Sequence, residues 1–175
     1  MGDLTMKPAI HIFVAAGLLA ACSADPAPSD HGQSDIVTEL APADLPGPVQ
    51  AAVSATMPDM TVMEVLRKER GDRVYFDVEG ERADGSEIEL DILFADGVAE
   101  VVEIQRDLPW ADVPGDVRDA AFEAGAAEPV RIIESVQTDG SIIYELFAEG
   151  MPSDPAMEVK SHEGQVEVLA ERWPH

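Results

Sequence analysis

An internal repeat is the feature that most restricts what this chain can fold into. The sequence ADLPGPV at residues 43–49 returns 68 residues later as ADVPGDV at residues 111–117, and five of the seven positions are identical. A match of this length rarely arises by chance, so we expect a tandem duplication of one small structural unit. The spacing leaves room in each unit for one helix and several strands.

The repeated segment is expected to start a helix in each unit. In the first copy Asp44 can cap the helix, and Pro46 fits the first turn, where a backbone N–H is not needed. Apolar residues then recur at helical spacing until Pro58 ends the helix. Asp112 and Pro114 take the same places in the second copy.

Runs of alternating apolar and polar residues follow each expected helix. The clearest run covers residues 87–92, in which Ile88, Leu90 and Ile92 point to one side, and acid–glycine turns separate the runs as in antiparallel hairpins. The expected strands cover residues 61–69, 73–81, 86–94, 98–106, 130–138, 141–148, 156–162 and 165–172. The predicted fold class is α+β, with two tandem repeats, each one helix packed on a four-stranded antiparallel sheet. The two sheets could join edge to edge or remain separate.

The N-terminal residues indicate export. Residues 10–21 form an apolar run that is too short for a permanent transmembrane helix. The sequence LAAC at residues 19–22 is typical of the site where bacterial lipoproteins are cleaved and lipidated. We therefore expect a signal peptide over residues 1–21 and lipidation of Cys22, the single cysteine of the chain, although an ordinary signal peptide followed by a free cysteine is the alternative. Lipidation predicts a location in the bacterial cell envelope, at the outer membrane and facing the periplasm.

Composition divides the remainder of the chain. Residues 22–43 are rich in Ala, Pro, Ser and Asp without a sustained period, which predicts a disordered tether. The two repeats are then expected over residues 44–110 and 111–175.

The charge is strongly unbalanced, with 35 acidic against 11 basic side chains and a formal net charge of −24. Such a surface repels nucleic acids and anionic lipid headgroups. It favours a cationic protein partner or divalent ions, unless it only maintains solubility or adaptation to salt. The strand alternation places many of the acids on the sheet face away from the helix, which we expect to be open to water. The expected partner-binding residues on this face are Tyr75, Asp77, Glu79, Glu87, Glu89, Asp91, Glu145 and Glu158.

A motif at the repeated helix start carries a resemblance to a known family. Leu-Pro-x-x-Val-x-x-Ala stands at residues 45–52 and Val-Pro-x-x-Val-x-x-Ala at residues 113–120, and a tyrosine-centred strand and a final acid–glycine turn follow each. This arrangement resembles the PepSY-like family, whose fold is similar to that of the β-lactamase inhibitor protein, over residues 44–172. The resemblance implies units that present a sheet surface to other proteins, as restraining or binding modules. It implies no catalytic residues.

Motifs for catalysis or cofactor binding are missing from the sequence. It contains no Gly-rich phosphate loop, no cysteine pair and no G-x-S-x-G turn. His31, His162 and His175 do not have the spacing of metal ligands, so no metal site is predicted. The Asp84–Gly85 and Asp139–Gly140 turns are interpreted as hairpins rather than calcium loops. We expect no enzymatic activity and no cofactor beyond weak binding of Ca²⁺ to the acidic face.

Together these features predict a lipid-anchored, non-enzymatic envelope protein that binds another envelope protein. It is a candidate inhibitor that restrains this partner. The alternative is an acidic envelope protein that binds divalent cations such as Ca²⁺, and a third reading is a purely structural envelope component. Trp110, between the two units, is expected either to pack their junction or to serve as an exposed anchor for a partner.

Overall fold

The structure is a computed structural model, and it describes residues 36–173. The predicted signal peptide, the lipidation site Cys22 and most of the predicted tether lie outside the described residues. Within the described part of the chain, no helix is both long enough and apolar enough to cross a membrane.

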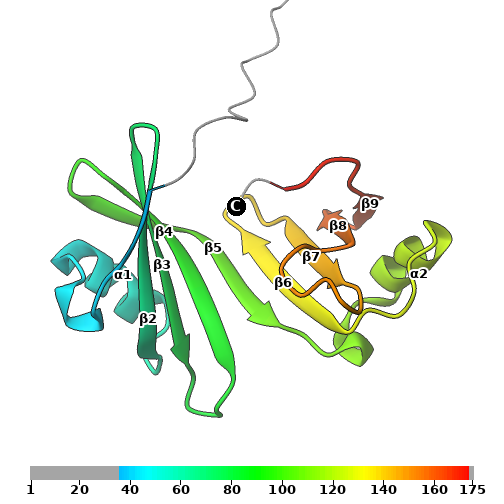
Figure 1. The fold of residues 1–175 in the computed structure, drawn as a ribbon, viewed down its shortest axis with the longest axis horizontal. Coiled ribbons are helices and arrows are strands. Elements are labelled where there is room, and N and C mark those ends of the chain that lie inside the picture. The colour runs from blue at the N-terminus through cyan, green and yellow to red at the C-terminus, as the bar shows by residue number, and fades with distance from the viewer. Residues whose placement is uncertain (1–35, 174–175) are drawn as a thin grey trace, which may run out of the picture. The chain divides into compact units, whose positions relative to one another are not determined.

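The described residues form one antiparallel sheet in which nine strands follow one another in chain order (Figure 1). Each strand pairs with the next one along the chain, and short connections join most neighbours, whereas helical segments at residues 42–56 and 110–123 lie between the strands of two pairs. Glycines with positive φ stand in several of these turns, for example Gly85 and Gly140. The strands are β1 (Ile36–Glu39), β2 (Thr61–Arg70), β3 (Arg73–Glu81), β4 (Glu87–Ala95), β5 (Val98–Asp107), β6 (Arg131–Gln137), β7 (Ile142–Phe147), β8 (Met157–His162) and β9 (Gln165–Val168).

This architecture corrects the predicted fold class. The prediction of two repeats, each one helix on its own four-stranded sheet, is wrong, because β5 and β6 pair from Glu103 and Gln137 to Asp107 and Ile133. An unpaired strand edge exposes a row of N–H and C=O groups, and the pairing of β5 with β6 satisfies both edges at once. The described residues therefore form one continuous sheet, and a helix packs on each of two separate parts of it.

The two α-helices are short and start after a proline. α1 (Gly47–Thr56) follows Pro46, and α2 (Gly115–Glu123) follows Pro114. The predicted caps are wrong, since neither helix has a side-chain hydrogen bond at its N-cap. Asp44 and Asp112 instead end the short 3-10 helices η1 (Pro42–Asp44) and η2 (Trp110–Asp112).

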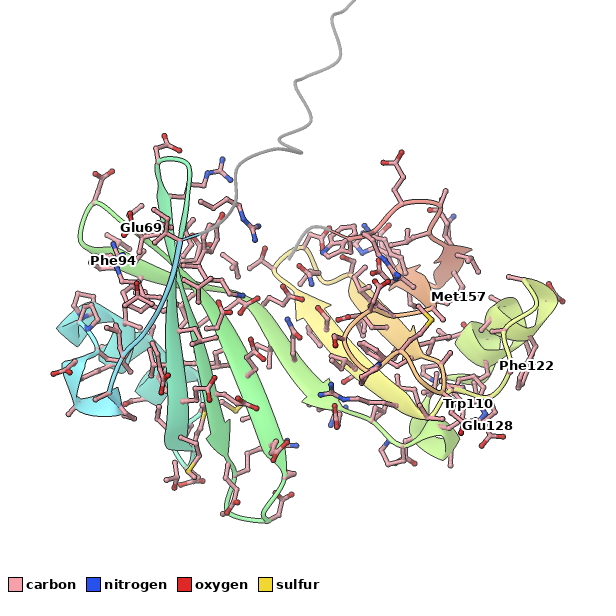
Figure 2. All side chains as sticks on the ribbon, in the orientation of Figure 1. Glu69, Phe94, Trp110, Phe122, Glu128 and Met157 are labelled. Carbon is pink, nitrogen blue, oxygen red and sulfur yellow. The ribbon has the colours of Figure 1, made fainter. Side chains whose placement is uncertain are left out.

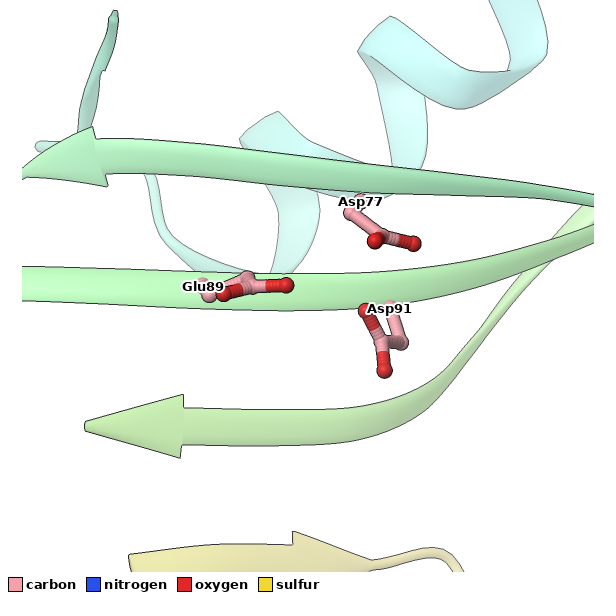
Figure 3. A group of neighbouring side chains, drawn as sticks. All are labelled: Asp77, Glu89 and Asp91. Carbon is pink, nitrogen blue, oxygen red and sulfur yellow. The ribbon is translucent and has the colours of Figure 1, made fainter. Parts of the chain in front are cut away.

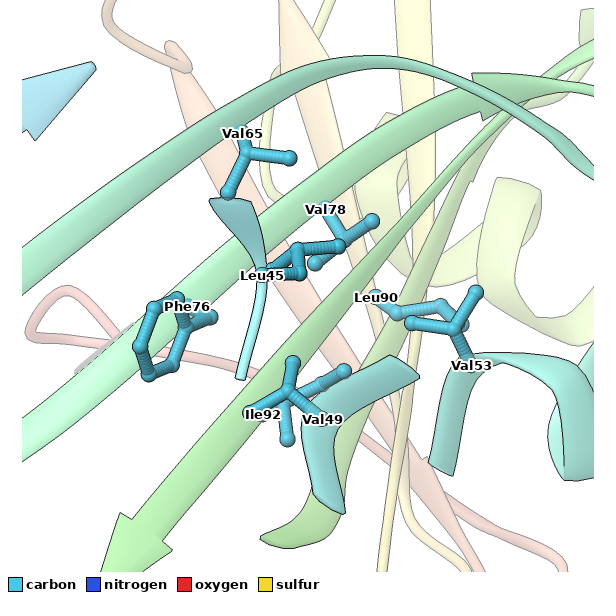
Figure 4. Packing of buried hydrophobic residues seen from close by; sticks show 8 residues of the cluster. All are labelled: Leu45, Val49, Val53, Val65, Phe76, Val78, Leu90 and Ile92. Atoms are coloured by element: carbon cyan, nitrogen blue, oxygen red, sulfur yellow. The ribbon is translucent and has the colours of Figure 1, made fainter. Parts of the chain in front are cut away.

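Each helix packs on a separate apolar cluster. Val49 and Val53, four residues apart on α1, are buried against strands β2, β3 and β4 (Figure 4). Val117 and Ala121 of α2 have the same spacing and pack on strands β6, β7 and β8. The first cluster consists of Leu45, Val49, Val53, Val65, Phe76, Val78, Leu90 and Ile92, and the second of Val113, Val117, Ala121, Ile132, Tyr144, Leu146 and Val159.

Both helices cover the same face of the sheet. Ile104 of β5 packs against the first cluster and lies directly opposite Val136 of β6, which lies opposite Ile142 of β7. Ile142 packs against the second cluster. Because residues directly opposite each other point to the same side of a sheet, the two clusters share one face. We call the other side the open face.

Two further predictions are settled by the fold. β1 pairs with β2 from Ile36 opposite Glu69 to Glu39 opposite Leu66, so residues 36–39 are a strand and this end of the predicted tether is corrected. Trp110 is half-buried, packs against the second cluster and meets the ring of Phe122 edge-on, with the ring centres 5.5 Å apart (Figure 2). Trp110 therefore packs against the second cluster, and no contact with the first cluster is observed among the described residues.

Candidate functional site

The open face carries the acids that alternate with the core residues of β3 and β4. Phe76, Val78, Leu90 and Ile92 point to the first apolar cluster, so the residues between them point the other way. Asp77 of β3 lies directly opposite Asp91 of β4, and Asp91 lies directly opposite Glu103 of β5. Three carboxyl groups thus form a row across neighbouring strands, an arrangement that is destabilising if all three are charged.

Three of these acids come close together in a group that we call the carboxylate cluster: Asp77, Glu89 and Asp91. One carboxylate oxygen from each lies within 4.8 Å of the others. Figure 3 shows the three carboxyl groups on neighbouring strands β3 and β4. Asp77 is 6% exposed and Asp91 7%, whereas Glu89 is half-buried and reaches water.

The surrounding side chains supply one positive charge and one hydrogen-bond chain. The Lys68 ammonium on β2 contacts Oδ2 of Asp77. On the other side of the cluster the Ser135 hydroxyl donates to Oε1 of Glu103, and Nε2 of Gln137 donates to Oγ of Ser135 at 2.7 Å. Oδ1 of Asp91 is buried and has no hydrogen-bond partner among the described residues.

These surroundings change the acidity of the cluster. Burial, reinforced by the negative charge of Asp77, raises the pKa of Glu89 to about 7. Burial and the charges of Asp77, Glu89 and Glu103 raise the pKa of Asp91 to about 9. Burial opposes the charged form of Lys68, yet the hydrogen bond and the charge of Asp77 outweigh it and raise the pKa of Lys68. At neutral pH the cluster therefore either retains protons or requires a cation.

The prediction that this whole face is open to water is wrong for half of the expected partner-binding residues. Tyr75, Glu79 and Glu89 are half-buried and Glu87 is exposed. The four that are buried are Asp77, Asp91, Glu145 and Glu158.

Glu158 is covered by the C-terminal segment, residues 169–173. The backbone N–H of Trp173 donates to Oε2 of Glu158 at 2.6 Å, and Nη1 of Arg172 donates to Oε1 at 3.3 Å. The ammonium of Lys160, on the same strand and the same face, lies 4.4 Å from the centre of the Trp173 ring. The segment therefore shields the open face over β8.

Two residues of the site, Lys68 and Glu103, were not predicted. Lys68 lies opposite Tyr75, and alternation along β2 was the signal that could have placed it on the open face. Glu103 could not be found in this way. A β-bulge shifts the register between Asp91 and Ile92 of β4, so Glu103 faces Asp91 although Val101 packs on the helix side.

Only some of the predicted site residues therefore come together in the structure. Strands β3 and β4 bring Asp77, Glu89 and Asp91 together, while Glu145 and Glu158 pair with each other across β7 and β8. No protein-family model matches the sequence, and the comparison with curated proteins also gives no match. The resemblance to the PepSY-like family therefore stays a prediction.

Proposed function

We propose that this chain is a lipid-anchored, non-enzymatic protein of the bacterial cell envelope that binds a positively charged segment of another envelope protein. The binding surface is the acidic rim of the open face, which we define as Glu79, Glu81, Glu87 and Glu89. Glu81 and Glu87 are exposed and the other two are partly exposed. A candidate consequence is restraint of the bound partner.

One observation carries this proposal: the rim consists of two carboxylate pairs placed directly opposite each other. Glu79 lies opposite Glu89, and Glu81 lies opposite Glu87, on neighbouring strands β3 and β4. Like charges at directly opposite positions weaken a sheet, so folding alone gives no reason to keep them there. A cationic side chain from a partner would relieve this repulsion, and the net charge of −24 would speed its approach.

Charge reversal on the rim tests the proposal. The double variant Glu81→Lys/Glu87→Lys and the matched control Asp119→Lys/Glu123→Lys, whose residues are exposed on α2, change the charge equally. We expect the rim variant to lose at least about nine-tenths of a salt-sensitive partner captured from envelope extracts, because rim charges set encounter and register. The control should capture as much partner as the unaltered protein.

A stability measurement separates binding from folding in this experiment. The single change Glu87→Lys creates an opposite-charge pair with Glu81, so it should leave the melting temperature unchanged or raise it. Equal partner recovery by the rim variant and the α2 control would show that the acidic rim is not the binding surface.

The anchoring part of the proposal rests on Cys22 and the sequence LAAC that ends there. Two or more acyl chains give stable attachment to a membrane, whereas one chain is marginal. We expect Cys22→Ser to move the protein from the membrane fraction to the soluble fraction and to abolish incorporation of labelled palmitate. Membrane recovery of Cys22→Ser equal to that of the unaltered protein would contradict lipid anchoring.

A further inference from the structure

The carboxylate cluster combines more negative charge than its surroundings neutralise. Asp77, Glu89 and Asp91 give three carboxyl groups, and the ammonium of Lys68 contacts one of them, Asp77. Buried charges are normally paired or bound to a metal ion. Together with Lys68, a divalent cation would balance the three carboxylates.

We propose that Asp77, Glu89 and Asp91 form a binding site for one divalent cation of the calcium class. This inference goes beyond the proposed protein binding and does not depend on it. The donor set contains carboxylate oxygens without imidazole or thiolate, which suits hard cations such as Ca²⁺ and Mg²⁺ and disfavours zinc or copper.

The spacing of the oxygens is compatible with Ca²⁺. Ligands on opposite sides of a Ca²⁺ ion stand about 4.6–5.2 Å apart, since each bond is about 2.3–2.6 Å long. The three oxygens lie within 4.8 Å of one another, so they can be ligands of one ion. Lys68 contacts Oδ2 of Asp77, and the carboxylate of Asp77 has a second oxygen that could bind a metal ion.

Oδ1 of Asp91 is a second observation that points to a ligand. The Asp91 side chain is more than nine-tenths buried, and this oxygen has no hydrogen-bond partner within the described residues. An orphaned buried oxygen costs about 1–3 kcal/mol unless a partner satisfies it. Coordination of a cation would satisfy it, and Glu89 is the member of the cluster that is partly exposed to solvent.

Calorimetric titration of the metal-free protein with Ca²⁺ at pH 8 and 150 mM salt tests the proposal. We expect one site per chain. Asp91→Asn and Glu89→Gln should each weaken binding at least tenfold. The control Glu100→Gln removes the same charge from an exposed position of the open face, directly opposite Leu93 and outside both the cluster and the acidic rim, and it should change the affinity less than twofold.

Loss of Ca²⁺ binding by a variant can be distinguished from misfolding of that variant. Asn has the shape of Asp and carries no charge, so circular dichroism and melting of Asp91→Asn without metal should match a folded protein. Absence of binding by the unaltered protein at millimolar Ca²⁺ would overturn the site. Equal binding by Asp91→Asn, or equal weakening by Glu100→Gln, would also overturn it, since either result means diffuse attraction to an acidic surface.

Discussion

Arg106 and Glu134 face each other across the β5–β6 pairing, and two nitrogens of the guanidinium approach the same carboxylate oxygen. The distance to Oε1 of Glu134 is 2.7 Å from Nε and 2.6 Å from Nη2. The Glu134 side chain is only 11% exposed, against 41% for Arg106, so Glu134 depends on this partner for its charge. The pair lies where the part of the sheet under α1 meets the part under α2.

We expect Arg106→Ala to lower the free energy of unfolding by about 1–3 kcal/mol, measured by urea denaturation. Without Arg106 the buried carboxylate of Glu134 has lost its positively charged partner. Because the position of Arg106 is half exposed, water can reach the carboxylate there and limits the loss of stability. Arg131 and Asp107 form a control pair between the same strands, with 3.0 Å between Nη2 and Oδ1 and both side chains about half exposed. Asp107→Ala should therefore change stability by less than about 1 kcal/mol. Equal losses in the two variants would show that burial does not set the strength of these pairs.

Strand positions were predictable from the sequence, because alternation and turn residues are local signals. β4 (Glu87–Ala95) lies within one residue of the expected range, and the same is true of β3 and β5. The joining of the sheet was not predictable, since the residues of β5 alternate in the same way whether or not its outer edge is paired. β1 was missed because a four-residue strand in a tether-like composition carries no pattern long enough to detect.

The site was predictable in its residues but not in its environment. Alternation correctly placed Asp77, Glu89 and Asp91 on the face away from α1. It could not indicate that Asp77 and Asp91 would be buried, because burial there depends on side chains from other strands. Nor could it place Glu103, whose direction is set by a bulge, or Glu158, which the C-terminal segment covers.

Gly80 is required where β3 passes the start of β2. A Cβ atom added at Gly80 would lie 2.5 Å from the backbone oxygen of Thr61 and 2.6 Å from Cε of Met60. We therefore expect Gly80→Ala to lower the free energy of unfolding by about 1–3 kcal/mol, as overpacking does elsewhere. Gly47→Ala is the matched control, since a Cβ there meets no atom within 4 Å. The control should be neutral or stabilise by up to about 1 kcal/mol through the unfolded chain, and a loss like that of Gly80→Ala would contradict the steric explanation.

Glu158 is expected to hold the C-terminal segment against β8. Glu158→Ala removes the acceptor for the Trp173 N–H and for Arg172, which should lower the free energy of unfolding by about 1–3 kcal/mol. Hydrogen exchange measured by mass spectrometry should rise over residues 169–173 and stay unchanged over β3 and β4. Glu167→Ala, at an exposed position of β9, is the control and should leave exchange of the segment as it is. Unchanged protection in Glu158→Ala would mean that other contacts retain the segment.

The cluster should also make stability depend on pH. Burial and neighbouring charges raise the pKa of Asp91 from 3.8 to about 9, so between these values the folded protein holds a proton that the unfolded chain has lost. The stabilisation from this proton is fully present below pH 4 and is lost as pH rises to 9, by at most about 1.4 kcal/mol per pH unit. Asp91→Asn has no proton to lose. Its free energy of unfolding relative to the unaltered protein should therefore increase steadily from pH 5 to pH 9, measured by urea denaturation with a metal chelator present.

Asp84→Asn is the control for this titration. Hydrogen bonds from the hydroxyl and backbone N–H of Ser86 lower the pKa of Asp84, which lies in the exposed turn between β3 and β4. Its carboxyl group is ionised in both the folded and the unfolded chain above pH 5, so this variant should differ from the unaltered protein by a constant amount from pH 5 to pH 9. If Asp91→Asn also gave a constant difference over this range, Asp91 would carry no proton in the folded protein, and the acids of the cluster would have to be neutralised by Lys68 alone.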